Sequence, residues 1–240
     1  MERLEALEAA HRVVSARFPD ALAAFLTGSA RTARITSTSD LDIVIVLRDR
    51  PAPFRETIRE YGWLVELFVQ NPGSIKNFSD AEAKEHRAPT LKMLSDGYIL
   101  VSVDGEAERL QLAAIERLAK GPSYISVEEM RNRRYALTDQ LDDFIGATDP
   151  MELLYICQQL LIGTSELALL SKSQWLASGK WLSRHLTASE PELSLRLFDA
   201  TTAVFATGDK DLLTTLVREI LERVGGSLME GYRVEGEVPD

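Results

Sequence analysis

The sequence predicts an α/β (α+β) domain followed by an all-α domain: a small mixed β-sheet with flanking helices over residues 1–121, and a helical bundle over residues 122–240. Two observations predict this division. Short apolar runs typical of strands are confined to the first half, and amphipathic helical patterns fill the second half. Gly121-Pro122 interrupts the chain where the pattern changes. The 240 residues, 45% of them hydrophobic, are sufficient for packed cores.

The first domain is expected to begin with a helix and to continue with four strands. Apolar residues at helical spacing over residues 2–17 predict a helix that packs on the sheet. Short apolar runs predict strands at 21–26, 41–47, 63–69 and 98–103. Between and after the strands, local patterns predict a turn at 71–73 and helices at 54–61, 74–95 with an interruption at Pro89, and 104–120 with Asp104 as N-cap.

The second domain is expected to be helical. Ser126, with Glu129 three residues later, forms a capping-box pattern, and Asp149 before Pro150 is typical of an N-cap followed by proline at the first helical position. Four or five amphipathic helices joined by short turns imply a bundle. The clearest helical patterns cover residues 126–146, 149–171, 192–206 and 209–224.

Composition narrows the partners and the compartment. A net charge of −10 argues against a nucleic-acid partner, because proteins that bind nucleic acids usually carry a basic surface. We recognise no signal peptide and no apolar span of about eighteen residues, so we expect a cytoplasmic protein without a membrane partner. The single cysteine, Cys157, lies in an apolar run and is expected to be an inert core thiol. A homodimer is left open.

The most informative stretch is residues 27–47, TGSARTARITSTSDLDIVIVL, in which acidic residues stand at the start of a strongly apolar run. Side chains alternate along a strand, so Asp40 and Asp42 are expected to point the same way, about 6–7 Å apart, close enough to share divalent cations. Carboxylates on one face of a core strand are costly unless they are paired or bind metal. We therefore expect a metal site, the alternative being a turn-and-cap pair at a strand start.

Gly28-Ser29, a ten-residue spacer, Ser39-Asp40-Leu41-Asp42 and the apolar strand that follows resemble the signature of the polymerase-beta-like nucleotidyltransferase superfamily. The resemblance implies a third carboxylate on a neighbouring strand, and Glu66 in WLVELFV fits; the alternative is an edge-strand carboxylate facing solvent. It implies that Asp40, Asp42 and Glu66 are catalytic and bind metal, with two Mg²⁺ ions expected and a nucleoside triphosphate as substrate. Glu66 is either a metal ligand or the general base.

The resemblance also implies that the loop after the first strand binds the nucleotide. Gly28 would let the backbone approach the phosphates, while Ser29 and Ser39 would supply hydroxyl and amide donors. Arg31 or Arg34 would add positive charge, the alternative being solvated loop arginines. The loop reads ARTAR after the Gly-Ser turn, where many relatives carry a small-Arg-Gly run.

The whole layout is similar to the small bacterial antibiotic nucleotidyltransferases, such as those acting on kanamycin, streptomycin or lincosamides. This similarity implies a catalytic domain over residues 1–121 and an acceptor-binding bundle over residues 122–240. Lys180 lies in a segment similar to one in many two-domain relatives, where it would reach the nucleotide phosphates; an exposed helix-end lysine is the alternative. Asp139 and Asp143 share a helical face suited to a cationic acceptor, or else form a solvated acidic stripe.

The expected function is therefore metal-dependent nucleotidyl transfer. A nucleoside monophosphate, in the first instance AMP from ATP, would move onto a hydroxyl of a small acceptor such as an aminoglycoside-like antibiotic. A rival interpretation is an antitoxin of the same superfamily that pairs with a toxin or modifies it by AMP transfer, although such chains are commonly shorter. A pseudoenzyme that only binds nucleotide is disfavoured by the three carboxylates.

Overall fold

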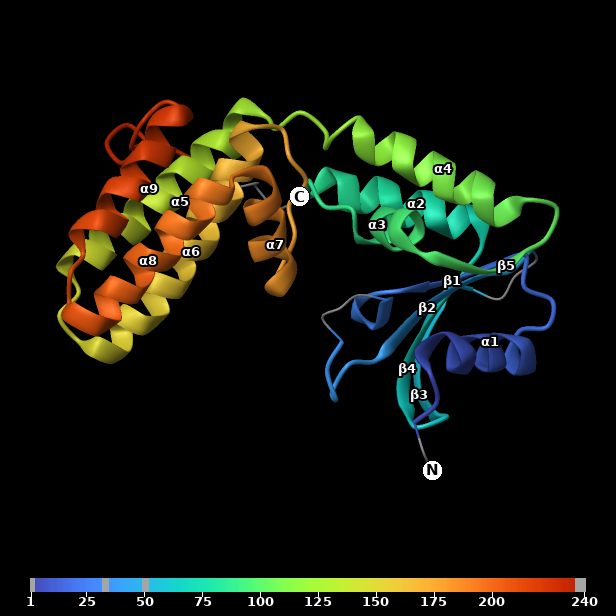
Figure 1. Ribbon diagram of the computed structural model, residues 1–240. Helices are drawn as coiled ribbons and strands as arrows, with labels where there is room; N and C mark the ends of the chain where they lie inside the picture. The colour runs from blue at the N-terminus through green and yellow to red at the C-terminus, as the bar shows by residue number, and fades with distance from the viewer. Residues whose placement is uncertain (1–2, 32–34, 49–51, 236–240) are drawn as a thin grey trace. The chain divides into compact units, whose positions relative to one another are not determined.

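The computed structural model describes residues 3–31, 35–48 and 52–235 (Figure 1). The chain separates into two compact units, Met1–Gly121 and Pro122–Asp240. The first unit combines a β-sheet with helices, and the second is built from helices, each around its own hydrophobic core. The predicted fold class, α/β followed by all-α, is confirmed.

The first unit contains a five-stranded mixed sheet with the strand order β3-β4-β2-β1-β5. The β2–β4 pair is parallel, and the other neighbours are antiparallel. Four of the strands lie at the predicted apolar runs. The strands are β1 (Ala23–Thr27), β2 (Leu41–Val46), β3 (Phe54–Glu60), β4 (Trp63–Gln70) and β5 (Tyr98–Ser102).

Helices cover both faces of this sheet (Figure 1). One face packs on α1 (Ala6–Arg17), and the other lies toward α2 (Pro72–Lys84), α3 (Pro89–Asp96) and α4 (Glu106–Ala119). Because side chains alternate along a strand, Leu41, Ile43 and Ile45 of β2 enter the core formed with α1. Asp42, which lies between them in the sequence, therefore projects from the face opposite α1.

The structure corrects the helix predicted over residues 54–61, which forms strand β3 instead. Glu56 and Glu60 are partly buried and pair with Arg17 of α1, at 3.0 and 3.2 Å, whereas Arg59 between them is exposed. This two-residue alternation is the period of a strand. The charged residues hide it from a search for apolar runs, and charge is common on an edge strand such as β3.

A two-residue turn joins β3 to β4. Glu60 pairs with Trp63, and the residues between them, Tyr61 and Gly62, have φ angles of 49° and 80°. Positive φ at both central positions is typical of the turns that close tight hairpins. Gly62 also leaves room for a neighbour, because a Cβ there would lie 2.7 Å from the Cα of Arg3.

Two predictions at helix starts also need correction. The predicted turn at residues 71–73 is the start of α2: Asn71 accepts a hydrogen bond from the Ser74 amide, and Pro72 is the first helical residue. Asp104 does not cap α4. Gly105, with a φ of 75°, occupies the cap position and makes no side-chain cap bond.

The second unit has five helices among its described residues. Ser126 and Asp149 cap the first two of them through their side chains, as predicted. In the last helix, buried residues recur at helical spacing: Leu213, Leu216, Val217, Ile220 and Leu221. The helices are α5 (Val127–Gly146), α6 (Pro150–Ser171), α7 (Lys180–Ser189), α8 (Pro191–Thr207) and α9 (Asp211–Arg223), of which α7 has no counterpart among the predicted helices.

Helix α6 corrects the expectation that the chain lacks a long apolar span. Judged by length and composition alone, α6 is long and apolar enough to cross a membrane, and it is the only such helix among the described residues. A core helix of a bundle meets the same criteria, and α6 contributes Leu160 and Leu167 to the core of the second unit. Cys157 is buried in the same helix, and burial raises the pKa of its thiol, which suits an inert core residue.

We predict that Asp149→Ala lowers the free energy of unfolding of the second unit by about 1 kcal/mol, the usual cost of losing an N-cap. The Asp149 Oδ1 atom accepts hydrogen bonds from the amides of Met151 and Glu152, at 2.8 and 3.0 Å. Urea titration measures the change. Gln158→Ala, an exposed position of the same helix, is the control and should change the value by less than about 0.5 kcal/mol. Equal effects of both substitutions would contradict the cap.

Candidate metal centre

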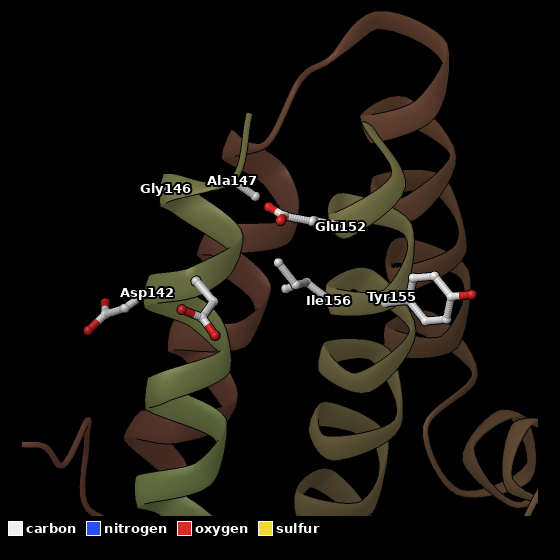
Figure 2. A pocket seen from close by; sticks show the side chains of 7 residues that line it. Asp142, Gly146, Ala147, Glu152, Tyr155 and Ile156 are labelled. Carbon is white, nitrogen blue, oxygen red and sulfur yellow. The ribbon is translucent and has the colours of Figure 1, made fainter. Parts of the chain in front are cut away.

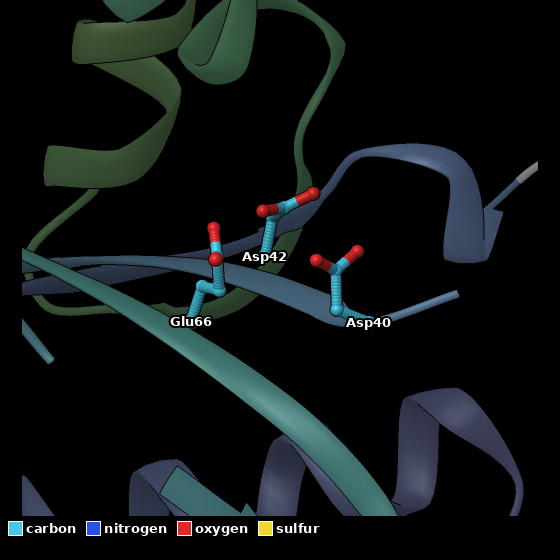
Figure 3. A group of neighbouring side chains, drawn as sticks. All are labelled: Asp40, Asp42 and Glu66. Carbon is cyan, nitrogen blue, oxygen red and sulfur yellow. The ribbon is translucent and has the colours of Figure 1, made fainter. Parts of the chain in front are cut away.

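Three carboxylates gather on one face of the sheet (Figure 3). One oxygen from each of Asp40, Asp42 and Glu66 lies within 4.8 Å of the other two. All three residues are partly buried, and their side chains point to the same side of the sheet. Like charges this close repel one another unless a cation lies among them.

Strand pairing brings these carboxylates together. Asp42 and Glu66 are direct neighbours in the parallel β2–β4 pair, so their side chains project from the same face. Asp40 stands immediately before β2, and Leu41 between the two aspartates is fully buried. The buried leucine anchors the start of the strand, and the aspartates on either side of it reach the opposite face.

The turn after β1 closes on one of the carboxylates. Thr27 pairs with Asp42, and Gly28 follows it with a φ of 75°, in the left-handed region that favours glycine. A Cβ on Gly28 would lie 2.0 Å from Oδ2 of Asp42. Glycine is therefore required here by the backbone and by the close approach of the carboxylate. Its predicted contact with phosphates stays a prediction.

The loop before Asp40 is held by its own polar groups. The Ser39 hydroxyl accepts a hydrogen bond from the Thr36 amide at 2.9 Å, and the Ser39 amide donates to the Thr36 carbonyl at 3.1 Å. The Ser29 hydroxyl lies 3.3 Å from the Ser39 hydroxyl and donates to it. The structure thus places the two serines predicted to bind nucleotide side by side, next to Asp40. Their contacts with a nucleotide stay predictions.

Arg55 of β3 reaches the third carboxylate. Its Nη2 donates to Oε2 of Glu66 at 2.5 Å, and its guanidinium lies 4.9 Å from the centre of the Phe68 ring. Sequence reasoning missed this residue because it interpreted residues 54–61 as a helix. The alternating pattern was the available signal: Thr57 pairs with Glu66, so Arg55, two residues away, shares its face.

The remaining residues predicted to bind nucleotide are not placed in this cluster. Arg31 ends a short 3₁₀ helix (Ser29–Arg31), but its side chain lies outside the described part of the structure, as does the whole of Arg34. Lys180 is exposed and begins α7 in the second unit. Contacts of these residues with a nucleotide stay predictions.

The two aspartates predicted to bind an acceptor differ in their surroundings. Asp143 lines an open pocket of about 580 Å³ between α5 and α6, together with Asp142, Glu152 and Tyr155 (Figure 2). Asp139, one helical turn earlier on α5, is exposed and is not one of the residues that line this pocket. Three carboxylates at one pocket would favour a positively charged ligand.

The ligand set of the sheet cluster is suited to a hard divalent cation. Asp40, Asp42 and Glu66 offer only carboxylate oxygens, the ligands that Mg²⁺ prefers, whereas zinc sites usually use cysteine or histidine. Mg²⁺ typically keeps water or phosphate oxygens in its remaining positions, which a partly buried cluster allows. The residues present therefore fit Mg²⁺.

We predict that Gly28→Ala weakens Mn²⁺ binding by about tenfold or more, the size of effect seen when a metal ligand loses its support. The new methyl group would displace the Asp42 carboxylate. Titration of Mn²⁺, a stand-in for Mg²⁺, followed by electron paramagnetic resonance measures the affinity.

Gly208→Ala is the matched control for this substitution. Gly208 has nearly the same φ, 76°, but a Cβ there would meet no atom within 4 Å. Both variants should lose about 1 kcal/mol of stability from the left-handed backbone. Only Gly28→Ala should lose metal affinity, and equal affinities in both variants would show that the glycine does not shape the site.

No protein-family model and no curated protein sequence matches the chain. Among solved structures, the chain is similar to a nucleotidyltransferase-like protein from Exiguobacterium sibiricum 255-15, with a TM-score of 0.48 and 12% sequence identity over 90% of this chain and 74% of that chain. Values this low do not establish a shared family, so the functional interpretation depends on the geometry of Asp40, Asp42 and Glu66.

Proposed function

We propose that this protein is a metal-dependent nucleotidyltransferase that moves a nucleoside monophosphate onto a hydroxyl of a small-molecule acceptor. One observation carries the proposal: the oxygens of Asp40, Asp42 and Glu66 lie within 4.8 Å of one another on adjacent strands. The glycine turn that packs against Asp42 supports it, because any side chain on residue 28 would collide with that carboxylate and displace it from the cluster. AMP from ATP is the favoured group.

The residues of the cluster suit this chemistry. When bound, divalent ions would neutralise the triphosphate, orient its phosphates and acidify the attacking hydroxyl. Asp40, Asp42 and Glu66 would hold two such ions, and Ser29 and Ser39 would donate hydrogen bonds to the phosphates. We include Arg31 and Lys180 in the nucleotide site as charge partners of the phosphates.

Glu66 has two candidate roles. Arg55 contacts its Oε2 atom, which leaves Oε1 to bind metal or to accept a proton from the acceptor hydroxyl. Glu66→Gln separates these roles. Weaker Mn²⁺ binding identifies a ligand, and a slower reaction with unchanged Mn²⁺ binding identifies a general base.

The proposed acceptor is a cationic, hydroxylated small molecule such as an aminoglycoside-like compound, bound by the second unit. Support comes from the acidic side chains of α5, Asp139 and Asp143, and from the pocket that Asp143 lines with Asp142, Glu152 and Tyr155. Carboxylates attract cations by their field as well as by contact, and a tyrosine supplies both an apolar ring and a hydroxyl.

Incubation of the purified protein with each labelled triphosphate, Mg²⁺ and a panel of aminoglycosides, lincosamides and cell extract tests the proposal. We expect labelling of a small molecule that stops when the metal is chelated. Labelling of an extract protein would favour the rival interpretation, a partner of a toxin that transfers AMP to it. Absence of any transfer, with no nucleotide binding, would contradict both.

We predict that Asp42→Asn lowers transfer by about a thousandfold or more, because metal ions contribute several kcal/mol to such reactions. The folded protein should be as stable or more stable, since one charge leaves a crowded cluster. Mg²⁺-ATP at about 100 times its Kd should stabilise the wild type by about 2.7 kcal/mol, seen as a higher Tm. ATP with a chelator should do so far less.

Asp20→Asn is the control for that substitution. Asp20 is an exposed aspartate in the turn after α1, so its substitution by Asn removes the same charge from the same unit. It should leave transfer and the Mg²⁺-ATP shift unchanged. Comparable turnover by the wild type and Asp42→Asn would contradict the assigned site.

We also predict that replacing Asp139 and Asp143 together by Asn raises the KM for a cationic acceptor severalfold, by about 1 kcal/mol of lost attraction at low salt. The KM for Mg²⁺-ATP should not change. The control is Glu192→Gln with Asp199→Asn, which removes two charges from exposed positions of α8. Equal effects of the two double variants would assign the change to net charge alone.

A further inference from the structure

The side chain of Arg3 binds the loop that leads into the first carboxylate. Its Nη2 donates to the carbonyl of Ser39 at 2.6 Å, and its Nη1 lies 3.3 and 3.4 Å from the carbonyls of Ser37 and Thr36. The Ser39 carbonyl belongs to the peptide bond that joins Ser39 to Asp40. A single guanidinium therefore holds three backbone carbonyls of this loop.

The same guanidinium rests on the strand that carries the third carboxylate. Its Cζ atom lies 3.3 Å from the centre of the Trp63 ring, and Trp63 is the first residue of β4, three positions before Glu66. Flat stacking on an aromatic ring leaves the edge of a guanidinium free to donate hydrogen bonds. Arg3 thus joins the Asp40 loop to Trp63, and both precede the first residue pair of the β2–β4 ladder, Leu41 and Val65.

The backbone around Arg3 is itself fixed to the β3–β4 hairpin. The Leu4 amide donates to the Tyr61 carbonyl at 3.2 Å, and the Trp63 indole donates to the Leu4 carbonyl at 2.8 Å. The close approach of Gly62 to the Cα of Arg3 completes this contact. Arg3 is therefore held on one side before its side chain reaches the loop.

The carbonyls of the loop are arranged to suit a donor of this kind. The hydrogen bonds between Thr36 and Ser39 close a tight turn, which directs three carbonyls to one side. A guanidinium carries five donors in one plane, whereas the ammonium of lysine is a single point charge. An arginine that also stacks on Trp63 is the side chain that meets both demands.

We propose that Arg3 is a positioning residue of the metal centre, which sets the place of Asp40 relative to Asp42 and Glu66. Asp42 and Glu66 are held by strand pairing, but Asp40 precedes β2 and depends on its loop. Arg3 itself touches none of the three carboxylates through the contacts described above. This inference rests on the proposed function, because it assigns Arg3 to the same cation site.

Mn²⁺ titration of the wild type, Arg3→Ala and Arg3→Lys tests this proposal without any acceptor. We expect Arg3→Ala to weaken Mn²⁺ binding by about tenfold or more, as for other partners that orient a metal ligand. The direction of the change in Mn²⁺ affinity is informative. Removing a positive charge near a cation site would by itself strengthen cation binding, so weaker binding reports the misplaced loop.

Arg12→Ala is the matched control. Arg12 lies over the ring of Tyr61 on the same hairpin, at 5.8 Å, and pairs with Glu8 at 2.7 Å. The Arg12→Ala variant loses the same charge as Arg3→Ala, and its Mn²⁺ affinity should equal or exceed that of the wild type. An equal loss in Arg12→Ala and Arg3→Ala would overturn the assignment of Arg3, because the loss would then reflect the hairpin.

Thermal unfolding of each variant separates positioning from stability. We expect Arg3→Ala to remain folded at the temperature of the titration. If it does not, the Mn²⁺ affinity of Arg3→Lys tests the role of Arg3, because lysine keeps the positive charge and the aliphatic stem and lacks only the planar set of donors. Mn²⁺ affinity equal to the wild type in the folded variant overturns the role of Arg3 alone. A wild type that binds no Mn²⁺ removes the proposed function and this inference together.

Discussion

The parallel pairing of β2 with β4 is the constraint on which the candidate site depends. It places Asp42 beside Glu66 on one face, so strand pairing keeps these two like charges close together in spite of their repulsion. Leu41, Ile43 and Leu67 are fully buried on the other face, and a shift of one residue would bring them out of the core. The apolar core therefore holds the carboxylates together, and a bound cation would relieve the repulsion that the core sustains.

The parts of the structure that could be predicted from the sequence are those set by short-range patterns. The apolar runs around Leu41 and Val65 mark buried strands, and the alternation of side chains along a strand indicates that Asp40 and Asp42 share a face. Ser126 and Asp149 announce helix starts because a cap is a contact with amides two or three residues away. Strands and caps of this kind depend on residues close together in the sequence, so the sequence alone is sufficient to predict them.

The parts that could not be predicted are contacts between distant residues made by long side chains. Arg3 meets Ser39, and Arg55 meets Glu66, only after β3, β4 and the loop have been assembled. The missed strand β3 removed the register that would have brought Arg55 into view. In the second unit, the pocket at Asp143 depends on how α5 lies against α6, which amphipathic patterns alone do not determine.

The contact between Gly28 and Asp42 makes the residue allowed at position 28 depend on the residue at position 42. As long as residue 42 is an aspartate in this rotamer, position 28 has no room for a side chain. In a related chain that lacks the proposed metal site, a small residue at position 42 would remove the steric part of that restriction, and the left-handed backbone at position 28 would be the part that remains. A glycine at position 28 together with an aspartate at position 42 would then distinguish related chains that keep the proposed cation site from those that keep only the fold.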